Sequence, residues 1–197
     1  AVRMLDNVID LNFYPLRKVK ATNLKSRSIG LGVMGEAEML ADYKLVWGSN
    51  EHFKKIDQIM EAISYNVIKS SSDLATQKGI YPTFAGSKWS QGIMPHDHAP
   101  QAVNALVDKD LFDASYDWDV LREKVKKDGM RNGYLMAVAP TSSISILVGT
   151  TQAIEPVYKR KWFEENLSGL IPVVVPKLSP ETWNYYTPAF EIDQLQV

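Results

Sequence analysis

The feature that most constrains the fold is a long amphipathic segment over residues 49–79. Ser49 or Asn50 can cap its start, and Gly79 can end it. Its apolar residues recur at helical spacing along one face: Phe53, Ile56, Met60, Ile63, Val67 and Leu74. The pattern predicts one long helix with a single face packed on a core.

Three other segments are expected to be helical. The first ends at Pro15, the second covers 117–129 with an aspartate cap and a final glycine, and the third begins at Ser179 with a proline in its first position. Residues 17–27 are interpreted as a basic linker. Residues 80–116 are rich in proline, glycine and histidine, and they are expected to form an irregular excursion.

Short apolar runs between these helices predict strands. They lie at Leu135–Ala139, near 153–158 and at Ile171–Val175, with a strand and turn at 28–35. Helices that alternate with short apolar strands are typical of α/β domains with parallel strands. We therefore expect the α/β class, with 1–197 as one partial domain.

The stretch MAVAPTSSISILVGTTQAIEP, residues 136–156, brings an apolar run to Pro140 and then to several hydroxyl side chains at the expected start of a short helix. The first N–H groups of a helix lack internal partners and the helix dipole is positive there, so this end can bind an anion. Alternatively, Thr141 or Ser142 only caps the helix. The stretch alone leaves both interpretations open.

Composition excludes several classes of function. The 197 residues carry a net charge of −1, which gives no electrostatic signature for nucleic acid. No apolar run approaches the roughly 18 residues of a transmembrane helix, and no signal peptide is recognisable. The absence of cysteine excludes disulfides and thiol nucleophiles within the chain. A cytoplasmic protein without a membrane partner is expected. Because the chain starts without Met inside a helical pattern, it is expected to be a piece of a longer protein.

Two short motifs resemble known ligand sites. GLGVMG matches GxGxxG at Gly30, Gly32 and Gly35, but a basic segment precedes it and Glu51 falls in the long helix, so structural glycines are favoured over a dinucleotide site. The PHDH stretch at 95–98 offers possible metal ligands. A proline-rich loop is the favoured interpretation, and no metal site is predicted.

Two side-chain pairs also have residue types that occur in catalytic sites. Glu36 and Glu38 are two residues apart on an expected helix, so they should face different directions and be solvated. Tyr185 and Tyr186 are interpreted as packing residues.

Four stretches together resemble the large catalytic subunit of class I ribonucleoside-diphosphate reductases: RSIGLGVMG, SSSDLATQKG, DWDVLREKVKKDGMRN and MAVAPTSSISILVGTTQAIEP. AVRMLDNVID, SQGIMP and NLSGLIPVVVP add to the match. The likeness runs from Ala1 to about Lys177. It implies the second half of a ten-stranded α/β barrel, incomplete in this chain.

The resemblance also implies a site. In the family, the proline and hydroxyl loop holds the diphosphate of a ribonucleoside diphosphate substrate, and the matching residues here are Pro140, Thr141, Ser142, Ser143 and Ile144. Thr141 and Ser143 would donate side-chain hydroxyls. The N–H groups of Ser142, Ser143 and Ile144 would complete the cradle.

The same resemblance implies partners and cofactors that lie outside the chain. The parent enzyme would reduce ribonucleoside diphosphates by a thiyl-radical mechanism, as a large-subunit homodimer with a small subunit that houses the radical cofactor, under allosteric control by ATP and dATP. This chain would hold no cofactor and no catalytic residue, because it lacks cysteine and the family's active-site Asn and Glu find no match. Tyr185 and Tyr186, followed by Thr-Pro, do not match the radical-relay pair.

Two other functions remain open from the sequence. One is a non-catalytic phosphate- or nucleotide-binding α/β module that shares the loop. The other is a scaffold piece that contributes only packing to a split enzyme. The reductase family requires an upstream segment similar to Asn-x-Cys-x-Glu, so the reading frame before Ala1 discriminates among them.

Overall fold

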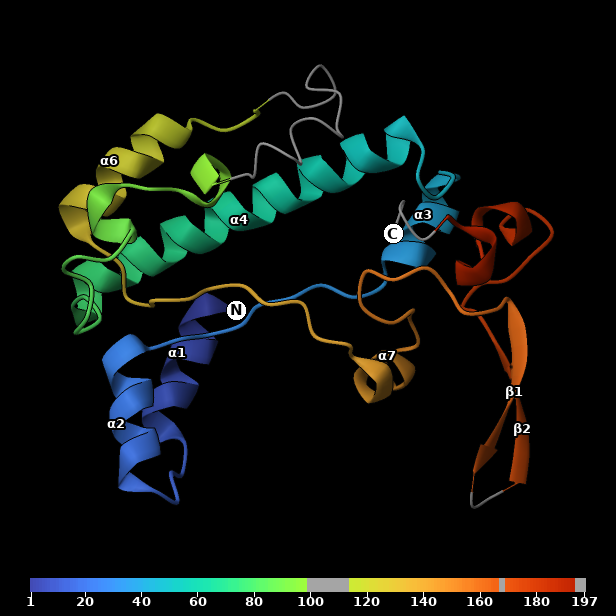
Figure 1. The fold of residues 1–197 in the computed structure, drawn as a ribbon, viewed down its shortest axis with the longest axis horizontal. Helices are drawn as coiled ribbons and strands as arrows, with labels where there is room; N and C mark the ends of the chain where they lie inside the picture. The colour runs from blue at the N-terminus through green and yellow to red at the C-terminus, as the bar shows by residue number, and fades with distance from the viewer. Residues whose placement is uncertain (99–113, 167–168, 194–197) are drawn as a thin grey trace. The chain divides into compact units, whose positions relative to one another are not determined.

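A computed structural model describes residues 1–98, 114–166 and 169–193 (Figure 1). The backbone divides into two compact units. Unit 1 comprises residues 1–31 and 57–137, and unit 2 comprises residues 32–56 and 138–197. The long helix α4, Asn50–Lys78, begins in unit 2 and continues through unit 1.

Unit 1 is mostly helical. It contains α1 (Val2–Leu11), α2 (Arg17–Ser26), most of α4, the 3₁₀ turns η1 (Trp89–Gln91) and η2 (Pro95–His98), and α6 (Trp118–Asp128). The predicted caps are confirmed, since Asp117 accepts the Val120 N–H and Ser49 Oγ accepts the His52 N–H. Gly79, at φ +85°, ends the long helix as predicted.

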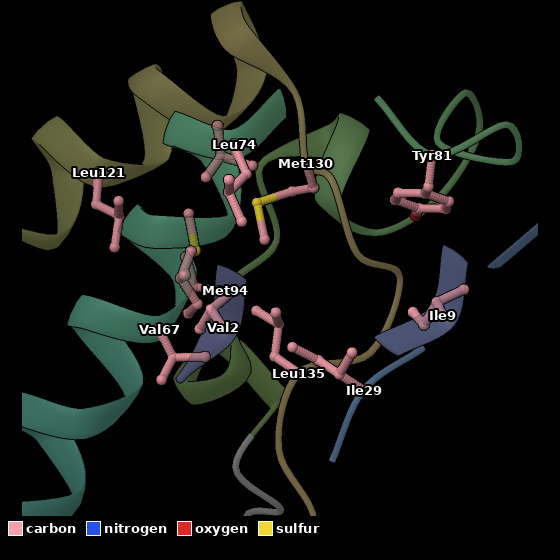
Figure 2. Packing of buried hydrophobic residues seen from close by; sticks show 12 residues of the cluster. Val2, Ile9, Ile29, Val67, Leu74, Tyr81, Met94, Leu121, Met130 and Leu135 are labelled. Atoms are coloured by element: carbon pink, nitrogen blue, oxygen red, sulfur yellow. The ribbon is translucent and has the colours of Figure 1, made fainter. Parts of the chain in front are cut away.

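Apolar side chains from these helices and from two extended segments form one core in unit 1 (Figure 2). Met94, Val125 and Met130 are completely buried. Figure 2 shows Val2 and Ile9 of α1 contributing to the same cluster as Val67 and Leu74 of α4 and Leu121 of α6. The other members are Ile29, Ile68, Tyr81 and Leu135. The apolar face predicted for the long helix is therefore confirmed at Val67 and Leu74, with Ile63 packed at its edge, but it is wrong at Phe53, which is exposed.

A buried polar network also lies inside unit 1. Asp6 is fully buried and accepts hydrogen bonds from Arg27 Nε at 2.9 Å and Asn132 Nδ2 at 3.1 Å. Arg131 Nε approaches its second oxygen at 3.2 Å. Burial by itself would raise the pKa of Asp6, but the hydrogen bonds and positive charges of Arg27 and Arg131 outweigh it and leave this pKa below its ordinary value.

The predicted strands at 28–35 and 135–139 meet in parallel but do not extend into a sheet. Leu31 and Met136 form a single parallel bridge, with the Leu31 N–H bonded to Leu135 O and the Ala137 N–H bonded to Leu31 O. Within the described residues of unit 1, no third strand continues this ladder. The two segments therefore remain extended chains.

Unit 2 contains α3 (Glu36–Tyr43), the short helix α7 (Ser142–Val148), and an antiparallel hairpin of β1 (Lys161–Asn166) and β2 (Gly169–Val174). The 3₁₀ turns η4 (Trp183–Tyr185) and η5 (Ala189–Glu191) follow the hairpin. Its core is small and consists of Ala37, Ala41, Val157, Val175 and Tyr186. Tyr186 donates to Pro176 O at 2.7 Å, so the packing interpretation of this tyrosine is confirmed.

Three predictions about local structure are wrong, and a fourth is confirmed as a strand but wrong about the direction of its partner. Residues 17–27 were interpreted as a linker but form α2, because lysine, alanine and leucine are strong helix formers despite the charge. No strand forms near 153–158, where Ala153 has φ +36° and Pro156 has no N–H. The helix expected from Ser179 is only a turn and η4. The strand predicted at Ile171–Val175 falls in β2, but its partner is antiparallel rather than parallel.

The irregular excursion expected at 80–116 is confirmed where it is described, with two 3₁₀ turns in place of longer helices; residues 99–113 lie outside the described residues. In the part of the chain that the structure describes, no helix combines the length and the apolar character needed to cross a membrane.

Candidate functional site

The proline and hydroxyl loop lies entirely in unit 2, where an extended chain turns abruptly into α7. Thr141 takes the left-handed conformation, with φ 54° and ψ 22°, and the helix begins at the next residue. A β-branched residue seldom adopts this conformation, which stores local strain. Such strain is common at ligand sites, where the surrounding structure holds a residue against its preference.

The start of α7 has no side-chain cap. The Thr141 side chain makes no capping hydrogen bond, and the bond from the Ser145 N–H to Thr141 O, at 2.8 Å, comes only at the fourth residue of the helix. The N–H groups of Ser142, Ser143 and Ile144 precede that bond, so they have no partner within the helix. The structure therefore does not support capping by Thr141 as the role of this hydroxyl.

The hydroxyls of the loop have different environments. Ser142 and Ser143 are exposed, whereas Ser145 is buried and donates to Ser142 O at 3.2 Å. Thr141 Oγ1 accepts the Ala153 N–H at 2.9 Å, which leaves its own proton available to donate. Pro140 and Ile144 are exposed at the two ends of the turn. The loop thus presents free N–H groups beside hydroxyls, the donor set that an oxyanion requires.

The segment after α7 anchors this loop to α3. Thr150 Oγ1 donates to Glu38 Oε2 at 2.5 Å, Thr151 Oγ1 accepts the Glu38 N–H at 3.2 Å, and Ala153 O accepts the Glu36 N–H at 3.5 Å. Two of the first N–H groups of α3, those of Glu36 and Glu38, are in this way satisfied by residues 150–153. Residues 150–153 are called the strap below.

The expectation that Glu36 and Glu38 are solvated is wrong. Their side chains are only 9% and 13% exposed, because α3 packs its first turn into unit 2. Glu36 Oε1 lies 2.9 Å from His52 Nε2, and His52 Nδ1 accepts the Gly48 N–H. Glu38 Oε1 pairs with Lys177 Nζ at 2.9 Å. Each carboxylate therefore has its own partner, and the two do not form a catalytic pair.

The glycine motif has a structural role. Gly35 has φ +87°, and a Cβ atom on it would lie 2.5 Å from Thr150 Oγ1, so glycine permits α3 to approach the strap. Gly30 faces Ala137 closely in the same way. No dinucleotide fingerprint is present at Gly30, Gly32 and Gly35, because α3 begins there without a preceding sheet strand in the described chain.

The PHDH stretch is a structural turn in unit 1. Asp97 accepts from Arg122 Nη1 at 2.6 Å and from the Met94 N–H at 2.7 Å. The hydrogen bond from Arg122, followed by that from Met94, holds the pKa of Asp97 well below its usual range. Among the described residues, no group of three or more potential ligands from His, Cys, Asp and Glu is arranged to hold a metal ion.

Sequence reasoning missed the residues that support the loop. Glu38 lies more than a hundred residues before Thr150 and Thr151 in sequence, and nothing in the local patterns indicates that they meet. Asp6, Arg27 and Asn132 were missed for the same reason, since each is a common residue in an ordinary helix or turn. The cluster of hydroxyl side chains after Pro140 was the sequence feature that indicated an anion-binding site.

Comparisons with known proteins identify the family of the chain. The family model described as the ribonucleotide reductase barrel domain matches residues 1–197. The chain is 67% identical over 192 residues to the ribonucleoside-diphosphate reductase subunit alpha of Helicobacter pylori, covering 98% of this chain and 24% of that protein.

More distant relatives give the same result. The chain is 42% identical over 194 residues to the subunit alpha of Treponema pallidum (98% of this chain, 21% of that protein) and 34% identical over 177 residues to the ribonucleoside-diphosphate reductase large subunit of Danio rerio (90% and 21%). The chain thus spans about a quarter or less of the length of these curated relatives. With the whole chain matched by the family model, the protein belongs to the ribonucleotide reductase barrel-domain family.

Proposed function

We propose that this chain is the part of a ribonucleoside-diphosphate reductase large subunit that holds the diphosphate of the substrate. The observation that carries the proposal is the uncapped start of α7, where three N–H groups lie beside the exposed Ser143 hydroxyl. Thr141 and Ser143 donate from their side chains, and Ser142, Ser143 and Ile144 donate from the backbone. Pro140 ends the extended chain that leads into the turn.

In this proposal, the residues that carry out the radical reduction lie in other parts of the large subunit. The chain contains no cysteine, so it cannot carry a thiyl radical or deliver electrons from a dithiol. Because the relatives are about four times longer, those residues lie in other parts of the large subunit. In the proposal, the chain forms the second half of a ten-stranded α/β barrel, and the radical comes from a small partner subunit. The large subunit is a homodimer regulated by ATP and dATP.

The test compares two neighbouring serines in the full-length subunit. Charge-assisted hydrogen bonds contribute about 1.5–3 kcal/mol, so Ser143→Ala should weaken the binding of a ribonucleoside diphosphate by roughly 10- to 100-fold. Ser142→Ala is the matched control, since it removes an equally exposed hydroxyl but keeps the N–H that the proposal uses. Its affinity should stay close to that of the unsubstituted protein.

Calorimetric titration with a ribonucleoside diphosphate and with the corresponding ribonucleoside measures both affinities. Only the diphosphate should respond to Ser143→Ala. Equal affinities in both serine variants would contradict the proposal. A phosphate-binding module without reductase function would bind the diphosphate in the same way, but the full-length protein would not turn it over.

A further inference from the structure

We propose that Glu38 is a positioning residue for the diphosphate loop and acts through the strap, residues 150–153. This inference rests on the proposed function of the loop. Glu38 does not touch the substrate in this account. Its carboxylate fixes Thr150, and the strap in turn fixes both ends of α7.

The start of α3 is in direct contact with the strap. Glu38 binds the strap twice, through its side chain to Thr150 and through its backbone N–H to Thr151. The Glu36 N–H adds a third bond, to Ala153 O. Gly35 lets the two segments approach, because any side chain there would collide with Thr150. Three of the four strap residues, Thr150, Thr151 and Ala153, therefore bond to the start of α3, which limits the freedom of the strap to move.

The strap also contacts the loop, at both ends of α7. At the start of α7, the Ala153 N–H bonds to Thr141 Oγ1 at 2.9 Å. At the end of α7, the Thr150 N–H bonds to Ser145 O at 3.0 Å. A displacement of the strap would therefore change the direction of the Thr141 hydroxyl and the position of the helix whose N–H groups form the cradle. Thr141 is also strained, so it needs such support to keep its conformation.

The negative charge of Glu38 is offset by a neighbouring lysine. An isolated carboxylate close to an anion site would oppose binding, but Glu38 is paired with Lys177 Nζ at 2.9 Å. Lys177 also binds Asp42 at 2.6 Å, and the hydrogen bonds of Asp42 and Glu38 raise the pKa of this lysine above its ordinary value. Lys177 therefore stays protonated at neutral pH. Glu38 can then hold Thr150 with its other oxygen while its own charge is offset.

The experiment uses the full-length reductase with its partner subunit. Thr150→Val removes the hydroxyl that donates a hydrogen bond to the Glu38 carboxylate. Thr150→Ser keeps this hydroxyl. We expect Thr150→Val to raise KM and weaken ribonucleoside diphosphate binding by about 3- to 10-fold with little change in kcat, because the lost energy concerns binding remote from the reacting atoms. Thr150→Ser should restore the affinity. The affinity for the ribonucleoside without phosphate should not change.

Asp42→Asn is the matched control, since it removes a carboxylate from the same helix and from the same lysine but does not touch the strap. It should leave diphosphate affinity unchanged. If Thr150→Val cannot be purified in folded form, Glu38→Gln replaces it, because the amide keeps the size of the side chain but loses the charge that holds Thr150 and Lys177. That variant should also weaken diphosphate binding.

The outcomes separate the two proposals. Normal diphosphate affinity in Thr150→Val together with a loss in Ser143→Ala would overturn the positioning role and leave the proposed function intact. Normal affinity in both variants would overturn both. An equal loss for diphosphate and ribonucleoside would indicate a general structural effect and would also overturn the positioning role.

Discussion

Unit 1 and unit 2 are stabilised in different ways. Unit 1 has an extensive apolar core and a buried Asp6 network, whereas unit 2 has a small core of two alanines, two valines and Tyr186. In unit 2 the helix α7 keeps apolar side chains exposed, with Leu147 at 86% and Ile146 at 69%. The candidate diphosphate loop lies in unit 2. Segments with few buried apolar contacts open most easily, and ligand-binding loops are often found in them.

This difference gives each unit a distinct expected response to substitution. Changes in unit 1 should alter stability and leave diphosphate affinity intact. Changes at the loop of unit 2 should alter affinity more than stability.

The largest expected effect follows from removing the buried charge of Asp6. Asp6→Ala removes the fully buried carboxylate bonded to Arg27 and leaves this buried guanidinium with the half-exposed Asp10; breaking a buried pair costs about 3–5 kcal/mol in the free energy of unfolding. Urea denaturation measures the change. Asp73→Ala is the control. Like Asp6, this carboxylate pairs with more than one cation, here two lysines, but it is 42% exposed. Its loss should lower the free energy of unfolding by about 1 kcal/mol or less. Similar losses in the free energy of unfolding for both variants would contradict the claim that the buried ion pair stabilises the protein more than the exposed one.

The same network should make unit 1 sensitive to acid. The pKa values of Asp6 and Asp10 are lowered in the folded protein, with Arg27 as the main favourable partner of both. A lowered folded pKa means that the stabilisation is fully present above the ordinary aspartate pKa of about 4 and is lost as the pH falls through the folded pKa. The free energy of unfolding should therefore decrease below about pH 4. Asp6→Asn should flatten this decrease, and an equally steep pH profile in that variant would exclude Asp6 as its source.

The smallest expected effect concerns the core of unit 2. Tyr186→Phe removes the hydroxyl that donates to Pro176 O while keeping the buried ring, so the free energy of unfolding should fall by about 1 kcal/mol. Thermal melting of the variant measures this loss. Diphosphate affinity should not change, because the lost hydroxyl bonds to Pro176 O and not to the loop residues 140–144 or the strap. A marked loss of affinity would show that this small core supports the loop directly.

Local sequence patterns predicted the helix ends and helix faces, because these depend on residues that are close together in the sequence. The caps at Ser49 and Asp117, the stop at Gly79 and the apolar face of α4 were all predictable, since each depends on spacing within a few turns. The helix start after Pro140 was predictable for the same reason.

Features that depend on tertiary contacts could not be predicted from local sequence patterns. The extended chains at Leu31 and Met136 satisfy strand patterns but find only one bridge, because strand formation depends on neighbours distant in sequence. Glu38 looked like a solvated surface residue, and only its distant partners Thr150 and Lys177 explain its burial. The loop was visible in the sequence, but the residues that support it were not.

The most direct test of the central claim is a crystal structure of the full-length subunit with a ribonucleoside diphosphate bound. The account predicts phosphate oxygens within hydrogen-bond distance of the N–H groups of Ser142, Ser143 and Ile144 and of the hydroxyls of Thr141 and Ser143, with the strap still bonded to Glu38. A diphosphate bound away from the start of α7, with these N–H groups facing only water, would contradict it.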